Sequence, residues 1–127
     1  MEFGKLATLA DHEAGAELNI LSPVNGSPTD VFIKIKGPDS KEWRREKKRQ
    51  TSKIIQAKSE GKMDELDYES MDIEALISIT ISWKNITKGG KPFKCTSGNA
   101  KELYMQSPSI VNQLLNFLSD GENFTKG

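Results

Sequence analysis

The sequence predicts an α+β fold that is mainly α, in which an N-terminal β-hairpin packs on a small bundle of about four helices. Apolar residues at every second position on both sides of a turn cluster predict the hairpin. A long charged segment with capping residues at both ends predicts the first large helix. An apolar stripe at helical spacing near the C-terminus predicts the last one. At 127 residues, the chain is long enough for one modest core.

We expect a single domain over residues 17–124, preceded by a flexible arm at residues 1–16 and followed by a short tail at residues 125–127. The arm shows no sustained periodicity and contains several small residues. Segments of this kind at chain ends are often poorly ordered unless they dock on something. We therefore expect the arm to become ordered on a partner.

The hairpin is expected within residues 17–36. Asn25-Gly26 lies in the turn cluster, and this dipeptide accepts the positive φ angles of a tight hairpin turn. A lone hairpin is marginal in water, so we expect its apolar face to dock on the C-terminal helix. The apolar residues of the two strands recur at every second position, namely Leu18 and Ile20, then Val31, Ile33 and Ile35.

The first large helix is expected from about Ser40 to Glu60. Asp39 and Glu42 have capping-box spacing, and Gly61 suits the left-handed residue that follows a helix. The few apolar residues can bury only a narrow face, so we expect this helix to project from the domain. Its cations form a candidate basic face consisting of Arg44, Arg45, Lys48 and Arg49.

Residues 71–83 fit two patterns. Ile77, Ile79 and Ile81 alternate with Ser or Thr, which favours a strand. The segment also has apolar residues at helical spacing from Ile73 onwards, and it is long for a strand. Periodicity alone leaves both interpretations open.

Two further helices are expected near the C-terminus, at residues 97–105 and 108–119. A loop containing Gly89-Gly90 and Pro92 precedes them. Ser107 and Pro108 suit the N-cap and first position of the second helix, and Asp120-Gly121 ends it. The stripe of that helix comprises Ile110, Val111, Leu114, Phe117 and Leu118.

The formal net charge of zero hides a strong polarity along the chain. Residues 34–62 carry a balance of +7, and residues 64–74 carry −6. The acidic segment could neutralise the basic helix within the fold. Alternatively, the basic helix could bind nucleic acid, or the two segments could pair between copies of the chain.

The residues give little support for an enzyme. Cys95 and His12 are the only cysteine and histidine, which excludes an intrachain disulfide framework and a His/Cys zinc site. The acids of residues 64–74 lack the calcium-loop pattern, and Gly89-Gly90-Lys91 lacks phosphate-loop spacing. We expect no catalytic residue, metal or cofactor. No apolar stretch approaches about 18 residues, so no membrane-spanning segment is expected.

The order of features between residues 18 and 124 resembles the small tail assembly chaperones of phages with long, non-contractile tails and of related prophages. The basic helix is denser in charge than is usual in that family, and the N-terminal arm has no clear counterpart. The residues that carry the resemblance are the turn Pro23 to Gly26, Gly37-Pro38-Asp39-Ser40, Trp83, Asn85-Ile86, Gly89-Gly90-Lys91-Pro92-Phe93, Ser97-x-Asn99, Leu103-Tyr104, Pro108-x-Ile110-x-x-Gln113, Phe117 and Asn123-Phe124.

The resemblance implies a non-enzymatic protein of the host bacterial cytoplasm that is absent from the mature virion. Such chaperones self-associate, bind and solubilise the tape-measure protein, and promote assembly of the tail tube. The implied partners are therefore the tape-measure protein and further copies of the chain, with the tail-tube protein as a third. The resemblance also favours a helix for residues 71–83, and it makes nucleic acid an unexpected partner.

Contact with such a client calls for exposed apolar residues flanked by charge. The candidate partner-binding residues are Trp83, Tyr104, Phe117 and Phe124, for each of which packing in the core is the alternative. The alternative function, drawn from the residues alone, is a small nucleic-acid-binding protein that uses the basic helix at residues 40–58.

Overall fold

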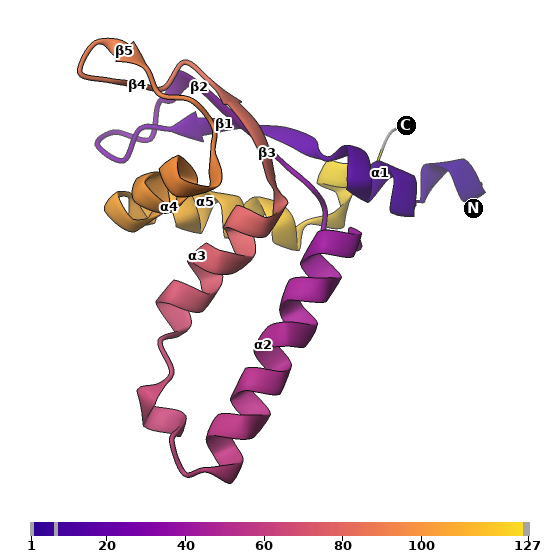
Figure 1. The fold of residues 1–127 in the computed structure, drawn as a ribbon. Helices are drawn as coiled ribbons and strands as arrows, with labels where there is room; N and C mark the ends of the chain where they lie inside the picture. The colour runs from indigo at the N-terminus through magenta and orange to yellow at the C-terminus, as the bar shows by residue number, and fades with distance from the viewer. Residues whose placement is uncertain (1, 7, 126–127) are drawn as a thin grey trace.

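The computed structural model describes residues 2–6 and 8–125. A three-stranded antiparallel sheet lies over helices α4 and α5, and a helical hairpin made by α2 and α3 projects away from the sheet (Figure 1). Helices account for 56% of the structure and strands for 19%, with a β-hairpin at the N-terminal side. This confirms the predicted α+β fold that is mainly α.

The described part of the chain comprises a sheet, four longer helices and several short elements. The sheet has the order β1-β2-β3 and contains β1 (Ala16–Leu21), β2 (Pro28–Ile35) and β3 (Thr80–Lys84). The longer helices are α2 (Lys41–Ser59), α3 (Tyr68–Ile79), α4 (Ser97–Gln106) and α5 (Pro108–Ser119). The short elements are η1 (Phe3–Lys5), α1 (Leu9–Ala14), η2 (Met63–Glu65), β4 (Thr87–Lys88), β5 (Lys91–Pro92) and η3 (Gly121–Phe124).

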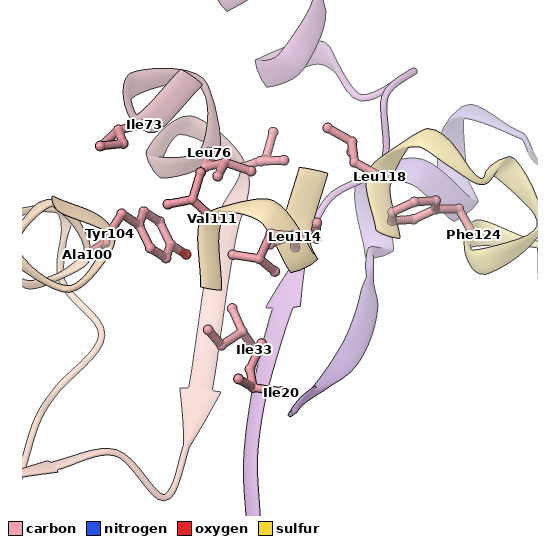
Figure 2. Close-up of a cluster of buried hydrophobic side chains, with 12 residues drawn as sticks. Ile20, Ile33, Ile73, Leu76, Ala100, Tyr104, Val111, Leu114, Leu118 and Phe124 are labelled. Atoms are coloured by element: carbon pink, nitrogen blue, oxygen red, sulfur yellow. The ribbon is translucent and has the colours of Figure 1, made fainter. Parts of the chain in front are cut away.

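The core forms between one face of the sheet and α3, α4 and α5. Leu18 pairs with Ile33, and Ile33 pairs with Trp83, so these side chains share one face of the three strands. Ile33 and Leu114 are both fully buried. Figure 2 shows Ile20 and Ile33 pointing toward Leu114 on α5. The predicted docking of the hairpin on the C-terminal helix is confirmed.

The segment 71–83 contains both of the structures that its sequence allowed. α3 ends at Ile79, and the chain passes directly into β3 at Thr80. The helix expected for all of residues 71–83 is therefore wrong for its last four positions. The physical reason is tertiary pairing. The N–H of Lys36 donates to the carbonyl of Ile79 at 2.9 Å, and residues 80–84 complete the sheet beside β2.

The N-terminus of α2 differs in detail from the prediction. Ser40 is the N-cap, and its hydroxyl accepts the N–H of Trp43 at 3.3 Å. Asp39 does not cap the helix, because it lies one residue before the N-cap. Its carboxylate lies 3.5 Å from Nε2 of His12 instead. At the other end, Gly61 has a φ of 70°, which agrees with the predicted left-handed position after the helix.

Helix α2 buries little of its surface. Its buried residues are Gln50 and Ala57, and Nε2 of Gln50 donates to the carbonyl of Met71 on the paired α3 at 2.7 Å. The remainder of the helix is largely exposed. This agrees with the expectation that the basic helix projects from the domain.

Part of the expected flexible arm is helical and packs on the domain. Leu9–Ala14 form α1, which a capping box between Thr8 and Asp11 begins. His12 is 3% exposed, and its Nδ1 accepts the N–H of Asp39 at 2.9 Å. This corrects the boundary expected at residue 17, since α1 belongs to the folded domain. Local sequence patterns could not reveal that α1 packs on the domain, because His12 contacts residues far along the chain.

The loop expected around residues 89–92 contains a small hairpin. Thr87 pairs with Pro92 and Lys88 with Lys91. Gly89 and Gly90 have φ angles of 60° and 78°, as a two-residue type I′ turn requires. This turn brings Phe93 back beside β3.

Candidate protein-binding site

Two of the four predicted contact aromatics are in the core. Tyr104 is 1% exposed and Phe124 is 2% exposed, so neither forms a contact surface in this structure. The hydroxyl of Tyr104 lies 2.7 Å from Oγ1 of Thr80, where α3 meets β3. The prediction that Tyr104 and Phe124 bind a partner is corrected: both are packing residues.

Phe124 is buried because η3 turns the chain back after α5. The side chain of Asp120 accepts the N–H of Glu122 at 3.1 Å and caps the short helix. Nδ2 of Asn123 donates to the carbonyl of Phe117 at 2.7 Å, which fixes η3 against the end of α5. Lying beyond the predicted end of α5 therefore does not expose Phe124.

Trp83 is half-buried and pairs with an aromatic residue that the predictions did not include. Its indole stacks on Phe93, with ring centroids 5.9 Å apart and planes 9° apart. Nε1 of Trp83 donates to the carbonyl of Phe93 at 2.6 Å. The signal for this pairing is the two-glycine turn between the two aromatics, which reverses the chain after β3.

An apolar groove of about 230 Å³ lies between α4 and the segment that contains residues 86–88 and Phe93. We call it the Phe93 groove; its lining residues are Ile86, Thr87, Lys88, Phe93, Glu102, Leu103 and Gln106. The ammonium group of Lys88 lies 5.7 Å from the centroid of the Phe93 ring and forms an ion pair with Glu102. The groove thus has an apolar floor and a charged rim, an arrangement suited to a protein side chain.

Phe117 lines a second, wider groove between β1 and α5, with a volume of about 470 Å³. We call it the Phe117 groove; its lining residues are Leu18, Asn19, Leu21, Gln113, Asn116, Phe117, Asp120 and Asn123. Phe117 is half-buried and meets Phe124 edge-on at 5.5 Å between centroids. Phe117 therefore packs against the core on one side and lines the groove on the other.

The predicted basic face is exposed on α2, but its members differ in whether they bond to other groups of the chain. Arg49 pairs with Glu46 at 2.5 Å and with Glu74 of α3 at 2.7 Å. Hydrogen bonds to these two carboxylates raise the pKa of Arg49, and the Arg49 guanidinium lowers the pKa of Glu46. Nε of Arg44 donates to the carbonyl of Asp39 at 3.1 Å. The remaining two members, Arg45 and Lys48, are exposed.

The thiol of Cys95 lies apart from both grooves. Burial raises the pKa of Cys95, so the thiol is protonated near neutral pH and is a poor nucleophile. Tyr104 is held as a core residue by its bond to Thr80. Neither the Cys95 thiol nor the Tyr104 hydroxyl therefore lines the Phe93 groove or the Phe117 groove.

Comparisons with known proteins add no assignment. No protein-family model matches the chain, and no curated protein or solved structure is significantly similar to it. Among residues 2–6 and 8–125, the helices are too short or too polar for any of them to cross a lipid bilayer.

Proposed function

We propose that this protein is a tail assembly chaperone of a phage or prophage with a long, non-contractile tail. It self-associates, binds and solubilises the tape-measure protein and promotes assembly of the tail tube in the cytoplasm of the host bacterium. The resemblance of residues 18–124 to that family supports the assignment, and the Phe93 groove is the observation that carries it.

The Phe93 groove fits the task of holding a long client reversibly. With about 230 Å³, it accepts an apolar side chain but not a whole helix. Burying one such side chain contributes about 1.5–3 kcal/mol, so a single contact is weak and short-lived. Several linked copies of the chaperone would bind a long client tightly through avidity, while each contact stays reversible.

The charges of the helical hairpin support self-association. The basic segment lies on α2 and the acidic segment on η2 and α3, and Arg49 with Glu74 joins them within the chain. Asp64, Glu65 and Glu69 are exposed on the acidic side. A basic face on one copy can therefore pair with an acidic face on the next, a contact between different surfaces that builds rings or open spirals.

The test of client binding uses a variant that fills the groove without disturbing the core. Gln106 lines the Phe93 groove and is exposed, so Gln106→Arg introduces a large charged side chain there. Co-expressed with the tape-measure protein of the same phage or prophage, the variant should capture at least tenfold less client in a pull-down. Gln56→Arg, at an exposed glutamine of α2, is the matched control and should bind normally. Undiminished capture by a folded Gln106→Arg variant would contradict the proposed site.

A gel-shift assay distinguishes the chaperone from a nucleic-acid-binding protein. At near-physiological salt we expect no sharp shift of DNA or RNA, because nonspecific contacts to phosphates weaken steeply with salt. A sharp shift that Arg45→Ala and Lys48→Ala abolish would favour the basic-helix alternative. A gene for a very long coiled-coil protein immediately downstream would support the chaperone.

A further inference from the structure

Three of the four side-chain amides that line the Phe117 groove, those of Asn19, Gln113 and Asn123, already have hydrogen-bond partners within the chain. Oε1 of Gln113 accepts the N–H of Leu21 at 2.8 Å, and Nε2 donates to the carbonyl of Leu21 at 3.0 Å. Nδ2 of Asn123 is bonded to the carbonyl of Phe117, and Nδ2 of Asn19 is bonded to two carbonyls of β2. What the groove offers to an occupant is therefore the apolar surface of Leu18, Leu21 and Phe117, together with the exposed amide of Asn116.

The N-terminal segment carries apolar side chains that the described part of the chain does not cover. Phe3 is 77% exposed, Leu6 is 46% exposed and Leu9 is 58% exposed. They recur at every third position, and the segment lies at the outer end of α1, away from the β1–β2 turn (Figure 1). Clustered exposed apolar side chains commonly mark an interaction surface. Single exposed residues such as Val24 need no such explanation.

We propose that the Phe117 groove binds the N-terminal apolar segment (Phe3, Leu6 and Leu9) of a second copy of this chain. Within the described residues, no apolar side chain fills the groove, and the side chains of Phe3, Leu6 and Leu9 remain exposed to solvent. Their charges are also complementary, since Lys5 is exposed within the segment and Asp120 is exposed at the rim of the groove. The occupant is thus a defined part of the same protein.

Helix α1, which begins at Leu9 of the segment, is held on its own domain by His12. The buried His12 accepts the N–H of Asp39 at Nδ1, and its carbonyl accepts the N–H of Gly37 at 2.8 Å. These bonds hold α1 on the domain. A second copy can fill the groove while α1 stays docked.

The contact joins two different surfaces, so it is heterologous. Two copies can exchange segments reciprocally, or each copy can bind the next in a ring or chain. The proposal specifies the self-association that belongs to the proposed function. Its test measures oligomeric state without the tape-measure protein, so failure of this contact and failure of client binding are separate results.

The experiment is sedimentation velocity on the full chain and on two single-surface variants. The segment variant combines Phe3→Ser with Leu6→Ser and so removes two of the apolar side chains of the segment. The groove variant, Asn116→Arg, places a charged side chain in the groove at an exposed position of α5. We expect the unmodified chain to associate at micromolar concentration and each variant to associate at least tenfold more weakly. Val24→Ser, at a residue that is 91% exposed on the hairpin turn, is the control and should associate normally.

Mixing the two variants supplies the decisive measurement. The segment variant keeps an intact groove, and the groove variant keeps an intact segment, so an equimolar mixture should form a one-to-one complex. Circular-dichroism melts confirm that each variant is folded, and Leu21→Ser replaces Asn116→Arg if the latter is not. A monomeric unmodified chain, normal association of either folded variant, or a mixture that stays monomeric would each overturn the proposal.

Discussion

The imidazole ring of His12 stacks on the phenyl ring of Phe124, with centroids 5.5 Å apart and planes 19° apart. Phe124 meets Phe117 edge-on, and Nδ1 of His12 accepts the N–H of Asp39. One buried cluster therefore joins α1, the connection between β2 and α2, the C-terminal η3 and helix α5. Residues near both ends of the chain stabilise the domain through this cluster.

Removal of the C-terminal residues should destabilise the domain strongly. A chain that ends at Asp120 lacks Phe124, which is 2% exposed, and leaves His12 without its stacking partner. Truncating a buried phenylalanine typically costs about 3–5 kcal/mol, so Phe124→Ala should lose a similar amount. Thermal melts by circular dichroism measure the loss, with Val24→Ala as the exposed control. A truncated chain that melts at the temperature of the full chain would contradict the structure.

Gly37 should not tolerate a side chain. A Cβ atom at this position would lie 2.3 Å from Nδ1 of His12 and 3.0 Å from the Phe124 ring. Gly37→Ala must therefore displace the cluster, with a cost of about 1–3 kcal/mol from overpacking. Gly98→Ala is the matched control, because nothing lies within 4 Å of its Cβ and alanine favours a helix. Urea denaturation of both variants should show opposite changes in the free energy of unfolding; equal changes would exclude the clash.

The elements predicted correctly are those fixed by local patterns. The alternation around Ile33 and the helical stripe around Leu114 are visible in short stretches, and each specifies one element. The boundary between α3 and β3 is different, because both patterns occur in one segment. Pairing with β2 decides where the helix ends, and this partner lies more than 40 positions earlier in the chain.

The candidate site was predictable only in part for the same reason. Phe117 lines a groove, and Trp83 stacks on Phe93, which lines the other groove. Tyr104 and Phe124 are instead buried by contacts with Thr80 and His12, which are distant in sequence. An aromatic residue beyond a helix end gives no local sign of burial. The Phe93 groove depends on the chain reversal after β3, so its geometry appears only when the hairpin of β4 and β5 is placed.

The docking of the sheet on α5 should fail if its central residue is charged. Ile33 is fully buried and pairs with Leu18 and Trp83 on the neighbouring strands. Ile33→Asp loses about 1.5–3 kcal/mol of apolar burial and also buries a carboxylate, so we expect an unfolded or strongly destabilised chain. Ile55→Asp, at a residue that is 63% exposed, is the control. Equal melting temperatures for the two variants would show that the strand face is wrong.

The hydroxyl of Tyr104 should make stability depend on pH in the alkaline range. Oγ1 of Thr80 donates to the carbonyl of Leu76, so Tyr104 is the donor in its 2.7 Å bond to Thr80. Burial raises the pKa of Tyr104 to about 12. A folded pKa above the unfolded value of about 10 means that stabilisation is complete below about pH 10 and is lost as the pH rises through about 12.

Tyr104→Phe should therefore be about 1 kcal/mol less stable near neutral pH. By about pH 12 it should be the more stable chain, because the loss in the unmodified protein reaches roughly 2 kcal/mol. Urea denaturation across this range measures the crossover, and Tyr68→Phe, at a residue that is 55% exposed, should show none. Parallel curves of unfolding free energy against pH for Tyr104→Phe and the unmodified chain would contradict the assignment of the Tyr104 hydroxyl as a buried hydrogen-bond donor.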